Sequence, residues 1–166
     1  MKPIVLIGRA DYWKEDLKEL QKLINDFDVM AVGLDCLYSG VIKYFVTYHP
    51  TDIVEYLKRR SFAETNTNFR IIGHKSNPGV DIIELHREPS GSSALLGSFA
   101  AIKLGYNKII LCGCPMEGRH PNNFQSYNHF QKGWIAYKSE VEGKVKSMSG
   151  WTKEFLGAPT EEWLED

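Results

Sequence analysis

Five short apolar segments constrain the fold of this chain more than any other feature. Apolar residues stand mostly at consecutive positions in each segment, which is typical of strands buried on both faces of a parallel sheet. The segments are residues 3–7, 27–33, 43–48, 69–73 and 108–113. They predict the main strands, and residues 80–85 fit either one more short strand or an extended loop.

Helical patterns lie between these segments. Residues 11–24 repeat apolar side chains at intervals of three and four, and Asp11 is a candidate N-cap for them. Residues 51–60 form a shorter pattern of the same kind. Residues 92–104 are rich in alanine and leucine and lead into Gly105, a combination that predicts a helix with a glycine C-cap.

The alternation of strands and helices predicts the fold class. It favours crossover connections and an α/β, Rossmann-like, three-layer fold with a mainly parallel sheet. A length of 166 residues suits one domain. We therefore expect a single Rossmann-like domain over residues 1–166, with a core at about 1–120 and a C-terminal helical tail at about 126–166.

The C-terminal region carries more aromatic residues than one small core obviously needs, which favours self-association, with a dimer as the simplest form. The alternative is that these rings cover an open face of the sheet within one chain. The residues concerned are Trp134, Tyr137, Trp151, Phe155 and Trp163. A helix is expected over residues 126–142, and a last short helix is expected to begin at Pro159 and Thr160.

The charge balance excludes some partners. Twenty basic and twenty-one acidic residues give a formal charge of −1, so no basic surface for duplex nucleic acid or an anionic membrane is expected. No apolar run approaches the roughly 20 residues that cross a bilayer. The first residues do not resemble a signal peptide, so we expect a cytoplasmic protein with reduced cysteines.

Cysteine spacing argues against a metal. Cys112 and Cys114 alternate along a predicted strand, so their side chains should point to opposite faces. A structural zinc site needs four ligands, and no Cys-x-x-Cys pair is present. We expect no metal site, and we expect Cys112 to be a core residue.

The candidate site follows from the fold. In open parallel sheets, ligands bind outside the carboxyl ends of the strands. Four segments should meet there, namely residues 8–11, 48–51, 89–93 and 113–120. Because the formal charge is near zero, any anionic ligand must be held locally by backbone N–H groups and a few side chains.

Gly91, Ser92 and Ser93 open the alanine-rich helix and form a candidate anion site. Free N–H groups and the positive end of the helix dipole favour a phosphate or carboxylate at such a position. We expect these N–H groups to be unpaired and to face a cleft shared with Gly8 and Arg9. The alternative is ordinary capping by serine. The turn at Gly8 has no further glycine, so it is not a dinucleotide fingerprint, but Arg9 is a candidate phosphate ligand.

Three histidines are candidate general bases because histidine exchanges protons near neutral pH. His120 and His129 are the candidate catalytic residues, and His49 is a candidate ligand-binding residue that could also serve as a base. Glu117 is a candidate for holding a magnesium–phosphate pair. For each of these side chains the alternative is a surface or structural role.

Three segments together resemble known proteins. They are MKPIVLIG, FDVMAVGLDCLYSGVIKYFVTYHP and GSSALLGSFAAIKLGYNKIILCGCPMEG. Their order resembles the Rossmann-like family that includes the 6-hydroxymethylpterin diphosphokinases, and equally the bacterial sialyltransferases of glycosyltransferase family 42. The resemblance covers residues 1–120. The tail from Lys144 onward is similar to short phage-type members of this group.

The resemblance implies that a nucleotide or nucleotide sugar binds at the carboxyl ends of the strands. It assigns ligand contacts to Gly8, Gly91, Ser92 and Ser93. Gly113, which begins the segment 113–120 expected at the same strand ends, is a further candidate ligand-binding residue. Magnesium accompanying the nucleotide is an open alternative. The chain departs from these relatives in its first turn, which lacks the usual Gly-x-Gly-Pro-Ser. It departs again at Cys114, which stands where an acidic residue is common.

Three functions therefore stay open on the sequence. The first is a transferase of the glycosyltransferase or diphosphokinase type. The second is a nucleotide-binding protein without turnover. The third is an assembly protein in which the pocket is a relic. The histidines near the predicted site favour the first function, whereas the altered first turn favours the other two.

Overall fold

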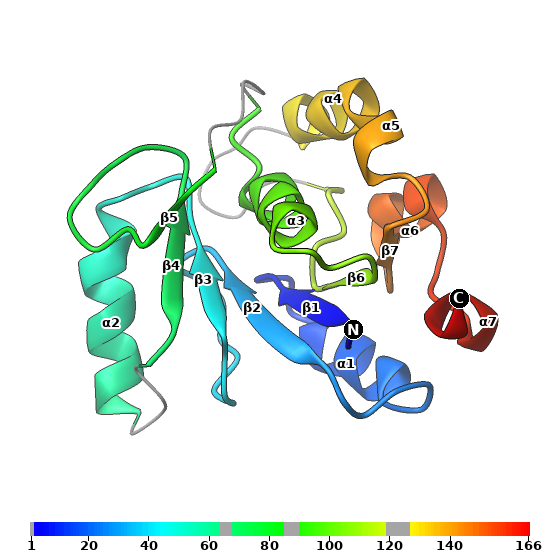
Figure 1. The fold of residues 1–166 in the computed structure, drawn as a ribbon, viewed down its shortest axis with the longest axis horizontal. Coiled ribbons are helices and arrows are strands. Elements are labelled where there is room, and N and C mark those ends of the chain that lie inside the picture. The colour runs from blue at the N-terminus through cyan, green and yellow to red at the C-terminus, as the bar shows by residue number, and fades with distance from the viewer. Residues whose placement is uncertain (1, 64–67, 85–89, 119–126) are drawn as a thin grey trace.

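The computed structural model describes residues 2–63, 68–84, 90–118 and 127–166 (Figure 1). Its centre is a seven-stranded sheet in the order β5-β4-β3-β2-β1-β6-β7, with every neighbouring pair parallel. The strands are β1 (Ile4–Ile7), β2 (Asp28–Val32), β3 (Tyr44–Val46), β4 (Arg70–Gly73), β5 (Ile82–Ile83), β6 (Ile109–Cys112) and β7 (Val145–Ser147). The predicted α/β, Rossmann-like fold with a parallel sheet is confirmed.

Helices cover both faces of this sheet. They are α1 (Trp13–Leu20), α2 (Asp52–Phe62), α3 (Ser93–Lys103), α4 (Asn128–Ala136), α5 (Lys138–Val141), α6 (Gly150–Leu156) and α7 (Glu161–Glu165). Buried residues form two apolar clusters, one shared by the sheet with α1 and α2 and the other with α3, α4 and α6. The two clusters are the two faces of the sheet and give the three predicted layers.

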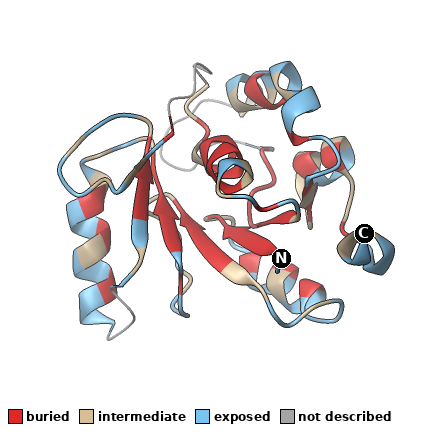
Figure 2. Cartoon of the chain, viewed as in Figure 1, coloured by how far each residue is buried: buried red, intermediate tan, exposed pale blue. Residues whose placement is uncertain are grey.

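The central strand β1 has apolar residues at consecutive positions because both faces of the sheet are covered there. Val5 and Ile7 pack in the cluster of α1 and α2, whereas Ile4 and Leu6 pack in the cluster of α3. All four side chains are buried, and the central strands are red along most of their length in Figure 2. Helix α3 approaches the sheet closely at Gly97, where an added Cβ would lie only 3.0 Å from atoms of the strand side chains.

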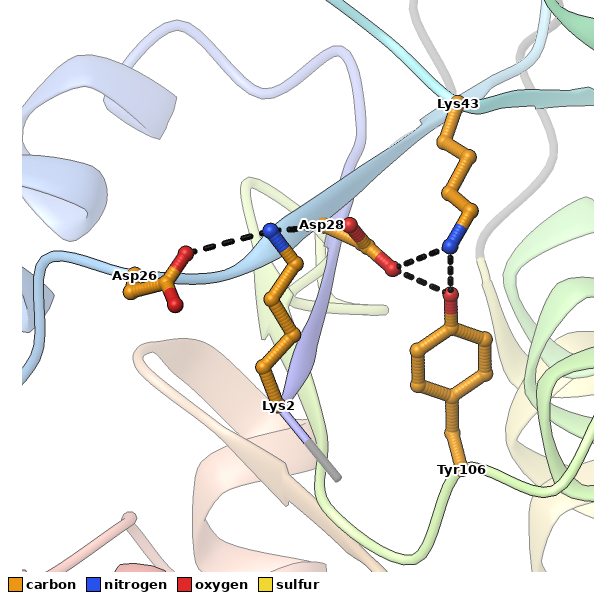
Figure 3. Close-up of polar contacts among 5 residues, drawn as sticks. All are labelled: Lys2, Asp26, Asp28, Lys43 and Tyr106. Carbon is orange, nitrogen blue, oxygen red and sulfur yellow. Dashed lines mark hydrogen bonds and ion pairs between the residues drawn. The ribbon is translucent and has the colours of Figure 1, made fainter.

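The amino-terminal edge of the sheet is fastened by a polar cluster (Figure 3). Asp28 accepts from Tyr106 OH and pairs with Lys43 Nζ at 2.7 Å and with Lys2 Nζ at 3.2 Å. Lys2 also reaches Asp26 at 3.1 Å. Burial alone would raise the pKa of Asp28, but the bonds from Lys43, Tyr106 and Lys2 outweigh it and lower this pKa. The cluster joins β1 and β2 to the residues that precede β3 and β6.

Several local expectations need correction. Helix α1 begins at Trp13 and has Tyr12 at its N-cap position without a side-chain bond, so Asp11 is not its cap. The expected helix over residues 126–142 is two helices, α4 and α5, which meet at Tyr137. Thr160 does cap the last helix, accepting from the Trp163 N–H at 3.1 Å.

The C-terminal region also differs from the expected helical tail, because it is not wholly helical. It adds β7 to the sheet beside β6, and α6 and α7 follow. Trp134 is completely buried, and Tyr137, Trp151 and Phe155 pack against the cluster of α3. Trp163 packs on the opposite cluster. These rings therefore cover the chain's own core, and self-association stays a prediction without this support.

Cys36, Cys112 and Cys114 are buried and free. Cys112 and Cys114 belong to opposite clusters, as their spacing predicted. Among the described residues, none of the helices has the length and apolar character that a membrane crossing needs.

Candidate functional site

A cleft of about 380 Å³ opens at the carboxyl ends of the central strands. This is the edge at which open parallel sheets bind ligands. The strand order places a switch point here, because the chain runs from β1 outward to β5 and then crosses back to β6 on the other side of β1. The lining comes from the ends of β1, β2, β3 and β6, from the start of α3, and from Tyr127 and Phe130 of the α4 region.

Two glycines allow the strand ends to meet at the base of this cleft. A Cβ on Gly8 would lie 2.4 Å from the Gly113 carbonyl oxygen, and one on Gly113 would lie 2.6 Å from Trp13 Cβ. Gly113 also has a φ of +65°, which favours glycine. Its N–H donates to buried Asp16 at 2.8 Å. Both predicted residues therefore lie at the site, and close packing explains why they are glycine.

The first turn of α3 supplies hydrogen-bond donors to the cleft. Ser92 is the N-cap, accepting from the Leu95 N–H at 3.3 Å, and its own N–H donates to Ser90 Oγ at 3.3 Å. The expectation of unpaired N–H groups is therefore wrong for Ser92, where serine capping operates. Within the described part of the chain, no hydrogen bond engages the N–H of Ser93 or of Ala94. These two groups remain available for an acceptor.

Arg9 lies at the rim of the cleft. Its guanidinium pairs with Asp35 at 2.9 Å, and both side chains are part-exposed. Arg9 and Tyr127 line the same cleft. Burial raises the pKa of Tyr127, and the positive charge of Arg9 offsets part of that rise. Arg9 and the start of α3 line the same cleft.

The turn after β3 brings His49 to the cleft together with Thr47 and Asp52. The His49 N–H donates to Thr47 Oγ1 at 2.9 Å, and the Thr47 hydroxyl donates to Asp52 at 3.3 Å. The Asp52 N–H in turn donates to the His49 carbonyl at 2.9 Å. The backbone of His49 is thereby fixed where His49 lines the cleft.

The cleft wall after β6 consists of residues 113–116, which we call the β6 wall. All four residues line the cleft. Met116 has a φ of +52°, a backbone conformation that non-glycine residues seldom adopt. Its carbonyl accepts from Gln131 Nε2 at 2.7 Å. Sparsely populated conformations of this kind persist where the surroundings hold them and often mark functional sites.

Most of the predicted site residues line one cleft, but not all of them. Those that line it are Gly8, Arg9, His49, Gly91, Ser92, Ser93 and Gly113. Among the described residues, Glu117 and His129 are not part of the lining. His129 is exposed on α4 with its ring against Phe130, and Glu117 is exposed beside Gly150. His120 lies outside the described residues.

Sequence reasoning missed part of the lining. Asp35 follows β2, and Thr47 and Asp52 flank the predicted turn at His49. The sequence did hold a signal for Asp35, because residues 27–33 were predicted as a strand of the parallel sheet and the carboxyl end of that strand must reach the same edge. Within the described part of the chain, His, Cys, Asp and Glu side chains form no cluster of three or more suited to a metal.

The fold and the cleft together define the class of this protein. This is a doubly wound parallel α/β protein with a ligand-sized cleft at its switch point. No family model matches the chain, and no curated protein matches it in sequence.

Among solved structures, a similar chain is the sialyltransferase CstII from Campylobacter jejuni, in complex with a substrate analogue, cytidine-5'-monophosphate (CMP). The match has a TM-score of 0.53 at 16% identity and covers 97% of this chain and 87% of that one. The two chains share a fold. Of the two groups that the sequence resembles, this neighbour represents the sialyltransferases. The likeness to pterin diphosphokinases and to phage proteins stays a prediction.

Proposed function

We propose that the cleft binds a nucleotide or a nucleotide sugar, and that the chain transfers a group from it. One observation carries the proposal. The Ser93 and Ala94 N–H groups, which have no hydrogen-bond partner among the described residues, line one cleft at the switch point together with Arg9. Helix N-termini and arginine side chains are common phosphate ligands.

The size and remaining lining of the cleft suit the other parts of such a ligand. Ligand pockets for small molecules measure roughly 300–1,000 Å³, and this cleft measures about 380 Å³. Tyr127 and Phe130 offer apolar faces on which a base or sugar can pack. The fold shared with a CMP-bound sialyltransferase adds support, since the matched region spans nearly the whole of this chain.

For the transfer step, His49 is the described side chain best suited to act as the base. It lines the cleft on a fixed backbone, and histidine exchanges protons near neutral pH. The second candidate function is nucleotide binding without turnover, as in a sensor or an assembly protein. The exposed position of His129, outside the cleft lining, favours that alternative.

A thermal-shift screen tests the binding proposal. The ligands are nucleoside monophosphates, nucleoside triphosphates, a pterin and nucleotide sugars, each at millimolar concentration. A ligand at about 100 times its dissociation constant stabilises the folded chain by about 2.7 kcal/mol, which raises melting by several degrees. No shift with any of these ligands would contradict the proposal. Release of free nucleotide from a bound nucleotide sugar separates transfer from simple binding.

A further inference from the structure

Thr152, in the C-terminal segment, contacts the cleft wall from behind. It belongs to α6, which packs against β7, and it is completely buried. Its hydroxyl donates to the Cys114 carbonyl at 2.8 Å, and its backbone N–H donates to the Pro115 carbonyl at 3.2 Å. One residue thus holds two successive carbonyls of the β6 wall.

The hydroxyl proton of Thr152 is directed by its neighbours. Ser147 of β7 places its Oγ 2.8 Å from Thr152 Oγ1. The Ser149 carbonyl is a second acceptor, 3.2 Å from Thr152 Oγ1 and 3.3 Å from Ser147 Oγ. The Cys114 carbonyl is the nearer acceptor for Thr152, and when Thr152 donates to it, the Ser147 hydroxyl can donate to Thr152. Removing the Thr152 hydroxyl would leave the buried Cys114 carbonyl without this donor, which is unfavourable.

The contacts of Thr152 also determine the direction of one backbone donor of the β6 wall, the Met116 N–H. The peptide bonds of the described residues are trans, so each N–H there points away from the carbonyl of its own peptide unit. The Pro115 carbonyl is turned toward α6, and the Met116 N–H of the same peptide unit is therefore turned away from α6. Among the described residues, no group accepts a hydrogen bond from that N–H.

We propose that Thr152 is a positioning residue of the cleft, which fixes the β6 wall so that the Met116 N–H can donate to an oxygen atom of the ligand. This inference rests on the proposed function, and it extends the site to the C-terminal segment, to which the sequence analysis assigned no site residue. Thr152 does not touch the ligand and acts through the backbone of residues 114–116.

The test uses the full chain labelled with ¹⁵N, with CMP as the probe. Titration of the unaltered protein should shift the Met116 amide resonance. Thr152→Val keeps the shape and the backbone N–H but removes the hydroxyl, and it should weaken CMP binding roughly fivefold to tenfold. Thr152→Ser restores the hydroxyl and should bind within about twofold of the unaltered chain.

A matched control separates positioning from general stability. Tyr106→Phe removes a hydroxyl that bonds Asp28 at the opposite edge of the sheet. It should lower stability and leave CMP affinity unchanged at a temperature where every variant is folded.

Equal affinity of Thr152→Val and the unaltered chain, or CMP binding without a shift at Met116, would overturn the positioning role alone. If CMP shifts no resonance, nucleotide binding and this inference both fall. If Thr152→Val does not fold, the Met116 resonance of the unaltered chain decides.

Discussion

At the amino-terminal edge of the sheet, Asp28 is bonded to Lys2, Lys43 and Tyr106, whereas at the carboxyl edge the Ser93 and Ala94 N–H groups have no bonding partner among the described residues. The first edge satisfies its polar groups internally and so contributes to stability. The second edge leaves donors for a ligand. The same parallel strands thus produce a structural end and a binding end, and substitutions should separate them.

The largest effect is expected where the strand ends touch at the cleft. Gly8→Ala places a Cβ 2.4 Å from the Gly113 carbonyl, and separating β1 from β6 there should cost about 3 kcal/mol. Gly33→Ala is the matched control. It also lines the cleft, but its Cβ would meet nothing within 4 Å, so only its φ of +75° should cost about 1 kcal/mol. Urea unfolding measures both, and equal losses would refute the close-contact explanation.

A smaller loss is expected at the amino-terminal edge. Tyr106→Phe removes one of the hydrogen bonds to the Asp28 carboxylate and should lower the free energy of unfolding by about 1.5 kcal/mol. Ligand affinity should not change, because the cluster lies at the opposite end of the strands from the cleft. Calorimetric unfolding and a CMP binding isotherm measure the two quantities. A weakened affinity in this variant would show that the two edges are coupled.

Lowering the pH should reduce the stability of the folded chain through the Asp28 cluster at the amino-terminal edge. The folded chain holds the pKa of Asp28 below its ordinary value, so the unfolded chain binds a proton first as the pH falls. The contribution of Asp28 to stability is complete above about pH 4 and is lost as the pH falls through the lowered pKa. Asp28→Asn should flatten this part of the pH–stability curve, and an unchanged slope would contradict the assignment.

The smallest effect is expected at the rim of the cleft. Asp35→Asn removes the carboxylate that pairs with Arg9 at 2.9 Å. Part-exposed ion pairs are worth at most about 1 kcal/mol, so freeing Arg9 and removing a negative charge should tighten CMP binding roughly threefold. The gain should fade at high salt because exposed charges are screened. Weaker binding in this variant would mean that Asp35 orients Arg9 for the ligand.

Sequence predicted the fold better than the site. Runs such as residues 3–7 and 108–113 identify central strands, because a strand buried on both faces must be apolar throughout. Strand β7 was not predicted, because Val145–Ser147 is short and has a charged residue, Lys146, in its middle, as edge strands often do. Neither the position of Glu117 nor the contacts of Thr152 could be foreseen, since both depend on how distant loops pack.

Serine at the start of α3 offers the most direct test of a ligand site at the carboxyl edge. Ser93→Asp puts a fixed negative charge at the helix N-terminus, where it favours folding but occupies the place of the ligand's own charge. Ser93→Asn has nearly the same shape without the charge. In CMP titration calorimetry we expect binding by the unaltered chain and by Ser93→Asn and none by Ser93→Asp, with stability preserved in all three. Equal CMP affinity of the Asp and Asn variants would contradict the account.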